Sequence, residues 1–254
     1  MDVYFELASE TFSRLSEREE LRSKLSERIE MRCFDVASKD ERKLFGREMG
    51  RYITLELKES LLSDEGIKEE AARALSHNIS RLLKRAHARR DIVLVAGLGN
   101  PKMTADSLGV EAAKAVRVVL SGRGVRTVIP SVFGETGVES YDVVRGVVKA
   151  IEPDAVIVVD TLACKSVDKL YKTFQLTDSG ISPGAGLMNR RKELNSATLG
   201  VPVIAVGVPL ISYTEQYPYD GDLCVTPKEI DVVVRVAGRI IAKGIDRAIY
   251  GRNA

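Results

Sequence analysis

From residue 91 onward, short and wholly apolar runs alternate with segments of helical periodicity. The apolar runs, rich in β-branched residues, are 91–96, 125–132, 154–159 and 201–208. The helical segments lie near 106–120, 137–151 and 227–250. Strands that are apolar along their whole length are buried on both faces, which is typical of a parallel sheet between helices. The pattern predicts an α/β fold with a twisted, mostly parallel sheet flanked by helices.

Polar positions are more frequent in the N-terminal third of the chain. Residues 10–27 are dense in charge, with apolar residues at helical spacing, and predict a solvated amphipathic helix. Residues 28–36 and 51–57 alternate apolar and polar positions over part of their length and predict two strands around a short charged helix near 39–47. Residues 66–88 predict a second amphipathic helix, whose basic C-terminal end complements the helix dipole.

We expect a single α/β domain over residues 1–254. Within it, the helix and strands of 7–60 pack on a core, and the candidate chemistry lies in 91–254. The Gly-rich tract 180–191 predicts an irregular loop. No apolar run approaches the roughly 20 residues of a membrane span, and the N-terminus has no secretory signal pattern. These features predict a cytoplasmic protein without a membrane partner.

Composition narrows the possible chemistry. The chain has only two histidines and three widely spaced cysteines, which argues against a His-rich metal site or a Cys-x-x-Cys motif. It has 36 acidic residues, so acid–base catalysis is expected to fall on Asp and Glu. A net charge of +2 gives no global basic field for nucleic acid. We therefore expect no metal, no cofactor and no direct nucleic-acid partner.

Glycines and acids follow the predicted strands. In open α/β sheets, functional groups gather beyond the C-terminal ends of strands, and glycines there let backbone N–H groups approach a ligand. Asp106 follows the first strand and Asp160 directly abuts the third. The other candidates in these loops are Gly97, Gly99, Asn100, Glu139, Asp178, Gly184, Gly186, Asn189 and Arg190. Asp106 also suits the N-cap of the following helix, and G-L-G-N lacks the full dinucleotide-binding spacing.

Seven ordered stretches resemble the germination proteases of spore-forming Firmicutes, which degrade small acid-soluble spore proteins when the spore revives. They are GRYITLEL (50–57), VAGLGNPKMTADSLG (95–109), FGETGVES (133–140), VVDTLACKS (158–166), QLTDSGISPGAGLMNRRKE (175–193), TLGVPVIAVGVP (198–209) and VTPKEID (225–231). The resemblance spans nearly the whole chain. It implies a fold similar to hydrogenase maturation proteases, within the phosphorylase/hydrolase-like folds. The two essential aspartates of the family correspond to Asp106 and Asp160.

The resemblance also implies a homotetramer, small acid-soluble spore proteins as substrates and a place in the forespore or spore core. The family is made as a zymogen that trims its own N-terminus after an acidic residue. Here Glu6-Leu7-Ala8-Ser9-Glu10 fits that context, so we expect cleavage between Glu6 and Leu7, with 1–6 as a propeptide. The alternative is a chance pattern near the terminus.

Two departures from the family pattern bear on regulation. Ser182 stands where relatives usually carry a His before the Pro-Gly of the glycine loop. Residues 212–223 replace a much longer insertion. These differences concern substrate binding, zymogen control or assembly.

An activated water is the economical mechanism for such a peptidase. Two nearby carboxylates rarely both ionise, so one acts as base on water and the other as proton donor. We take Asp160 as the base and Asp106 as the donor, and the reverse assignment stays open because a coupled pair titrates as a unit. Backbone N–H groups near 97–99 or 184–186 are candidates for the oxyanion, and Glu139 and Asp178 for orienting water or binding substrate.

Four other possibilities remain open at this point. One is a metal-dependent peptidase, since the maturation proteases that the chain resembles can bind a metal through carboxylates and His, although the shortage of His in this chain weakens it. A cysteine peptidase would need Cys164 as a thiolate. A regulatory relative would bind acidic peptides through Arg190, Arg191 and Lys192. A peptidyl-tRNA-hydrolase-like esterase would share the GLGNP motif, but that class relies on a His, and none follows Gly97 in this chain.

Overall fold

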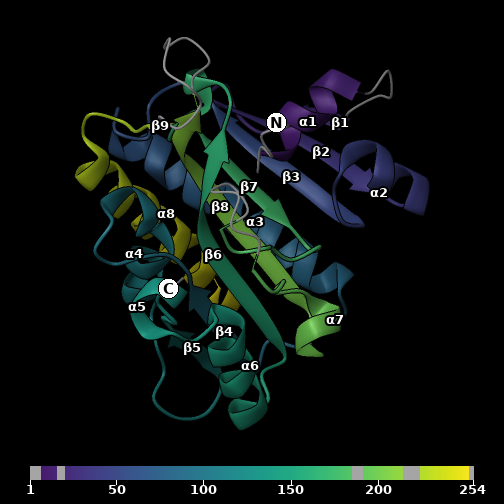
Figure 1. Ribbon diagram of the computed structural model, residues 1–254. Helices are drawn as coiled ribbons and strands as arrows, with labels where there is room; N and C mark the ends of the chain where they lie inside the picture. The colour runs from purple at the N-terminus through teal and green to yellow at the C-terminus, as the bar shows by residue number, and fades with distance from the viewer. Residues whose placement is uncertain (1–6, 16–20, 185–190, 214–223, 252–254) are drawn as a thin grey trace.

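A twisted sheet runs through the centre of the computed structural model, which describes residues 7–15, 21–184, 191–213 and 224–251. Within these residues the sheet has nine strands in the order β1-β2-β3-β7-β8-β6-β4-β5, with β9 added on β8 (Figure 1). The strands are β1 Leu21–Lys24, β2 Ile29–Val36, β3 Gly50–Leu57, β4 Ile92–Gly97, β5 Gly124–Val128, β6 Ala155–Cys164, β7 Thr173–Thr177, β8 Val203–Tyr213 and β9 Cys224–Val225. All of them belong to one sheet, so the structure is a single α/β domain.

Helices flank this sheet. They are α1 Ala8–Leu15, α2 Lys39–Phe45, α3 Glu65–Arg85, α4 Leu108–Ala115, α5 Phe133–Thr136, α6 Ser140–Ile151, α7 Ser196–Leu199 and α8 Ile230–Tyr250, with 3₁₀ turns η1 Thr104–Asp106 and η2 Val167–Lys169. The expected helices of 66–88, 137–151 and 227–250 are thus present with slightly different ends. In the described part of the chain, no helix combines the length and the apolar character needed to cross a bilayer.

The α/β fold class is confirmed, and the sheet is mixed. Parallel pairing joins β5, β4, β6 and β8, the four strands that the apolar runs predict. The remaining pairs are antiparallel. The connection from β6 to β7 holds only the short turn η2, which is too short for a right-handed crossover, so β7 returns antiparallel beside β8. The expectation of a mostly parallel sheet therefore holds for half of the strand order only.

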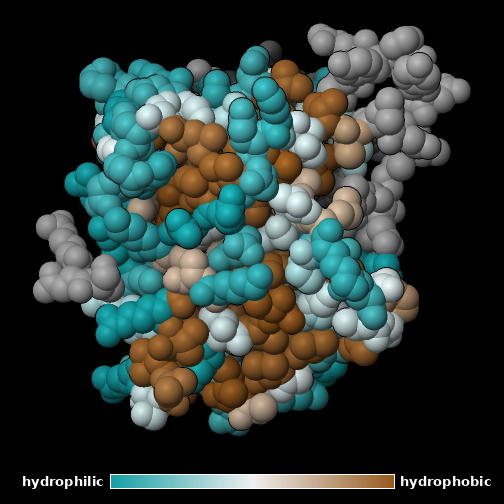
Figure 2. All heavy atoms as spheres, turned by 90° about the vertical axis from the view of Figure 1, so that its left-hand side faces the viewer, coloured by the Kyte–Doolittle hydropathy of each residue, from teal (hydrophilic) through white to brown (hydrophobic). Residues whose placement is uncertain are grey.

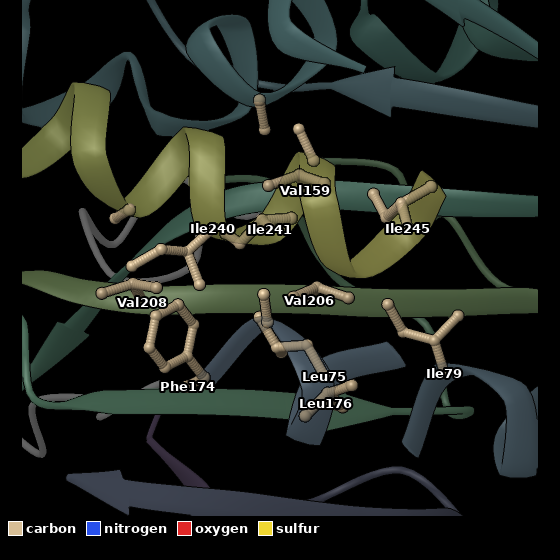
Figure 3. Packing of buried hydrophobic residues seen from close by; sticks show 14 of the residues in the cluster. Leu75, Ile79, Val159, Phe174, Leu176, Val206, Val208, Ile240, Ile241 and Ile245 are labelled. Atoms are coloured by element: carbon tan, nitrogen blue, oxygen red, sulfur yellow. The ribbon is translucent and has the colours of Figure 1, made fainter. Parts of the chain in front are cut away.

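The two faces of the sheet are covered by different apolar layers. Alternate residues of each strand point to opposite faces. On one face, side chains of α3 and α8 pack against β6, β7 and β8, as Figure 3 shows for Leu75, Ile241 and Phe174. On the other face, Val144 of α6 and Leu199 of α7 pack on β4 and β6. The second layer covers only part of its face and leaves the C-terminal end of β6 for other groups.

The expected helix over 10–27 is wrong in its second half. Helix α1 ends at Leu15, and residues 21–24 form the edge strand β1, which pairs antiparallel with β2. The helix expected near 106–120 also stops at Ala115, and a bridge between Val118 and Val125 follows. In both places, backbone pairing with the strand that follows next in the chain outweighs the local helical spacing.

Candidate active site

Asp160 lies where β6 continues past the end of its neighbour. The parallel pairing of β4 with β6 ends at Gly97 opposite Val159, so Asp160 is the next residue on β6. The residue is only 6% exposed, and its Oδ1 accepts the Thr161 N–H at 2.9 Å. An acidic side chain is thus carried on a rigid central strand at the edge of the sheet where ligands bind in such folds.

Asp106 lies in the loop after β4. Its Oδ2 and its backbone carbonyl both accept the Asn100 N–H, at 2.9 and 3.0 Å. Gly99 makes this fold of the loop possible: its φ is +106°, and a Cβ there would come 1.8 Å from the Asp106 carbonyl oxygen. Ser107 is the residue at the N-cap of α4, and it makes no capping hydrogen bond. The carboxylate of Asp106 therefore stabilises the loop and does not cap the helix.

A hydrogen bond ties the two aspartate-bearing segments together. The Thr161 hydroxyl donates to the Ala105 carbonyl at 3.0 Å, which joins β6 beside Asp160 to η1 beside Asp106. Thr161 was not among the residues predicted for the site, and its position directly after Asp160 is the feature of the sequence that marks it.

Both aspartates line one cleft. Five other residues named from the sequence line it too: Gly99, Asn100, Glu139, Gly184 and Arg191. Met103 and Phe133, which the sequence analysis did not single out, contribute exposed apolar side chains to the lining. The structure thus brings together segments from three strand ends and the glycine loop around two carboxyl groups.

The two halves of the cleft differ in electrostatics. Burial raises the pKa of Asp106 to about 6, although the Asn100 N–H opposes the rise. Glu139 instead forms an ion pair with Arg191, Nη1 to Oε1 at 3.1 Å, and the guanidinium lies 4.8 Å from the centre of the Phe133 ring. Asp106 is therefore suited to hold a proton in mildly acidic solution, up to about pH 6, whereas Glu139 is held as an ion-pair partner.

Other candidates lie elsewhere. Asp178 accepts the Arg51 N–H at 2.6 Å and the Arg85 Nε–H at 3.2 Å, outside the cleft lining. Gly97 is buried within β4. Glu6, Gly186, Asn189 and Arg190 fall outside the described residues. The described residues also contain no cluster of three or more His, Cys, Asp or Glu side chains that could hold a metal ion.

Cys164 does not have the properties of a nucleophile. The thiol is buried, and burial raises its pKa to about 12. Its Sγ donates to the Ser166 carbonyl at 3.3 Å. A neutral, buried thiol gives no support to the cysteine-peptidase alternative.

A comparison with known proteins identifies the family. The profile described as "Germination protease" matches residues 7–216. The chain belongs to the germination protease family. The germination protease of Clostridium acetobutylicum is 32% identical, over 89% of this chain and 86% of that protein. That of Bacillus subtilis is 37% identical, over 72% of this chain and 53% of that protein. The germination proteases are peptidases, so this family assignment supports a role of the chain as a spore protease.

One further relative and one solved structure are also similar to the chain. The germination protease of Caldanaerobacter subterraneus is 32% identical, over 98% of this chain and 94% of that protein. That alignment runs over 309 positions against 254 residues here, so this relative has residues that the chain lacks. Among solved structures, the [NiFe] hydrogenase maturation protease HycI of Thermococcus kodakarensis matches with a TM-score of 0.40 and 18% identity, over 65% of this chain and 98% of that one.

Proposed function

We propose that this chain is an endopeptidase that starts the degradation of small acid-soluble spore proteins during germination and cuts after acidic residues. The observation that supports the proposal is that Asp106 and Asp160 line the same cleft, with the pKa of Asp106 raised by burial to about 6. A germination protease needs a group that activates water and a group that protonates the leaving amine. The two carboxyl groups supply both.

The proposed reaction is a water-mediated hydrolysis. The Asp160 carboxylate takes a proton from water as the water oxygen bonds to the carbonyl carbon of the scissile peptide. Asp106 then gives its proton to the amide nitrogen as the C–N bond breaks. The Leu98 N–H is already bonded to the Val159 carbonyl at 2.9 Å, so we assign the oxyanion to backbone N–H groups at Gly99 or Gly184 in the cleft lining.

Substitution of the aspartates tests this mechanism. Asp106→Asn or Asp160→Asn should reduce cleavage of a small acid-soluble spore protein by about 10²–10⁴-fold, because each removes a positioned proton-transfer group. Fragment masses would report cleavage after acidic residues, and circular dichroism would show that the fold persists. Retained activity in either variant would contradict the dyad. Binding of the spore protein without any cleavage by the wild type would instead favour a regulatory relative.

We further propose self-cleavage between Glu6 and Leu7. The chain from Leu7 onward is anchored to the body of the protein: Leu7 is fully buried beside Cys164 and Leu170. The Glu10 carboxylate accepts the N–H groups of Lys165 and Ser166 at 2.9–3.1 Å. Loss of residues 1–6 would leave these contacts in place. Mass spectrometry under mildly acidic conditions should show that loss; an intact N-terminus in active enzyme would contradict it.

Assembly and location are also proposals. Large apolar side chains reach the surface, and Leu120 is 96% exposed. Figure 2 shows apolar patches among hydrophilic residues on one face of the molecule. Such patches support an oligomer, for which we propose a tetramer in the forespore or spore core. Light scattering of the purified chain measures the assembly; a monomer at micromolar concentration would contradict it.

A further inference from the structure

At the rim of the catalytic cleft, an ion pair joins the loop that carries Asp106 to helix α5. Nζ of Lys102 lies 3.0 Å from Oε1 of Glu135. Lys102 belongs to the loop between β4 and α4, and Glu135 lies in α5, the four-residue helix after β5. The described lining of the cleft includes their neighbours Met103 and Gly134 but not the pair itself. The ion pair therefore joins two walls of the cleft from outside.

Hydrogen bonds connect this ion pair to the carboxyl group of Asp106. The Lys102 N–H donates to Oδ1 of Asn100 at 2.9 Å. The Asn100 N–H donates in turn to Oδ2 of Asp106 at 2.9 Å. Two hydrogen bonds thus separate the backbone of Lys102 from the Asp106 carboxyl group, so a displacement of Lys102 would reach Asp106 through Asn100.

The loop needs such an anchor, because residues 101–104 are four exposed positions in a row. Exposed segments with few buried contacts open at a small cost in free energy. At the C-terminal end of the loop, the Thr161 hydroxyl binds the Ala105 carbonyl and ties it to β6. Within the exposed stretch, Lys102 makes the contact with α5. The ion pair is thus placed to fix the part of the loop that precedes Asp106.

Glu135 is itself held in a defined position. The Ser131 hydroxyl donates to its Oε2 at 2.9 Å, so both carboxylate oxygens have partners. Hydrogen bonds from Lys102 and Ser131 lower the pKa of Glu135 below its usual range. Ser131 has a φ of +60°, in the left-handed region that residues other than glycine seldom adopt. Such conformations persist where the surrounding contacts fix them, and they are frequent at active sites.

Helix α5 is also bound on the side of the glycine loop. Arg191 pairs with Glu139, just after α5, and its guanidinium lies over the ring of Phe133, the first residue of α5. Because α5 is fixed from this side, it gives the loop of Asp106 a defined element to bind.

We propose that Glu135 is a positioning residue of the peptidase reaction: by binding Lys102, it holds the loop of Asp106 against α5 and so places the Asp106 carboxyl group in the cleft. This inference rests on the proposed endopeptidase function. It assigns no chemistry to Glu135, which acts only through Asp106. Placement of this kind matters because a misplacement of about 1 Å can lower a rate by about 10²-fold.

Reversing the charge of each partner tests the assignment. Glu135→Lys sets two lysines against each other and should lower kcat for a small acid-soluble spore protein by about tenfold, with KM changed less than about twofold. Lys102→Glu should act similarly, and it should fold even if Glu135→Lys does not, because the Lys102 side chain is 80% exposed. The double variant restores an ion pair with exchanged charges, so its kcat should return to within about threefold of wild type.

A similar ion pair elsewhere supplies the control. Lys114 and Glu111 lie 3.1 Å apart, but both belong to α4, so they join no second element. Glu111→Lys brings two lysines together in the same way and should leave kcat unchanged. Urea unfolding of all variants shows whether each is folded in the assay.

The Asp106→Asn background separates positioning from a general structural role. If Glu135 acts through Asp106, Glu135→Lys should add less than about twofold to the loss in that background. A full tenfold loss there, a wild-type kcat in either single variant, or a double variant no better than the singles would overturn the assignment. A wild type that does not cleave the spore protein would overturn the proposed function itself.

Discussion

Carboxylates have opposite surroundings in the two halves of the sheet. In the antiparallel half, Asp35 of β2 accepts two hydrogen bonds from Arg51 of β3, at 2.6 and 2.8 Å. This pairing lowers the pKa of Asp35 below its usual range. In the parallel half, burial raises the pKa of Asp106 to about 6, and no described basic side chain contributes to the shift. The same residue type is thus held ionised in one half and inclined to stay protonated in the other.

The difference follows from how the strands are joined. Antiparallel neighbours place side chains directly opposite each other, so Asp35 meets Arg51 in register. In the parallel half, Asp106 lies in the loop after β4, whereas Asp160 lies on β6 just beyond the end of its pairing with β4, opposite Gly207 of β8, which has no side chain to meet it. Strand ends of this kind leave carboxyl groups facing a cleft, which suits catalysis more than stability.

The largest expected effect is a difference in kcat/KM between variants of Asp106 and Asp178. Both aspartates were predicted from the sequence as site residues. Asp106→Asn should lower kcat/KM by about 10²–10⁴-fold. Asp178→Asn keeps an acceptor for the Arg51 N–H and touches no reacting atom, so kcat/KM should change by less than about threefold. Steady-state kinetics on one peptide measures both. A large loss in Asp178→Asn would extend the functional region into the antiparallel half.

A second prediction concerns stability against pH. Because the folded-state pKa of Asp106 lies above 3.8, the native state holds its proton more tightly than the unfolded state. The wild type should therefore lose stability relative to Asp106→Asn as pH rises from about 4 to about 6, by up to ~2 kcal/mol, a figure reduced for partial exposure. Urea unfolding across this range measures it. A constant difference would contradict the raised pKa.

For Asp35, the same experiment should show stability changing with pH in the opposite direction. Its folded-state pKa is lowered, so the stability it contributes is present above its ordinary value of 3.8 and is lost as pH falls below that value. The difference between wild type and Asp35→Asn should thus shrink on acidification. If both aspartates gave the same sign, the contrast between the two halves would fail.

A smaller effect is expected from the ion pair itself. Arg51→Met leaves Asp35 without its guanidinium, and both side chains are partly exposed, so the loss should be ~1 kcal/mol in urea unfolding. Arg89→Met is the control, because the Arg89 side chain is 76% exposed where it pairs with Asp91. It should cost less than about 0.5 kcal/mol. Equal losses of unfolding free energy in the two variants would show that the Asp35–Arg51 pair stabilises the fold no more than an exposed ion pair does.

The smallest effect is expected from thiol alkylation. Cys164 is buried with its pKa raised to about 12, whereas Cys224 is exposed. Iodoacetamide at pH 8 should modify Cys224 and leave peptidase activity unchanged, because only thiolates react quickly. Peptide mapping by mass spectrometry locates the label. Inactivation that parallels labelling of Cys164 would move the chemistry from the aspartates to the thiol.

Much of the parallel half was predictable from local pattern. The apolar runs predicted β4, β5, β6 and β8, because a strand buried on both faces is apolar at every position. Asp106 and Asp160 were named because acids after such strands meet at one edge of the sheet. The antiparallel half was harder to predict from the sequence. The edge strand β1 lay inside an expected helix, because the spacing of its own apolar residues does not show that it pairs with β2.

The amino-acid sequence by itself determined which segments form buried strands, which helices cover them, and that acids and glycines cluster after the strands. These are properties of residues close together in the chain. Only the tertiary structure decided that Asp106 and Asp160 share a cleft while Asp178 is bound by Arg51 and Arg85, which lie 127 and 93 positions away. Burial and charge partners, which set what a carboxylate can do, come from groups that meet only when the sheet is assembled.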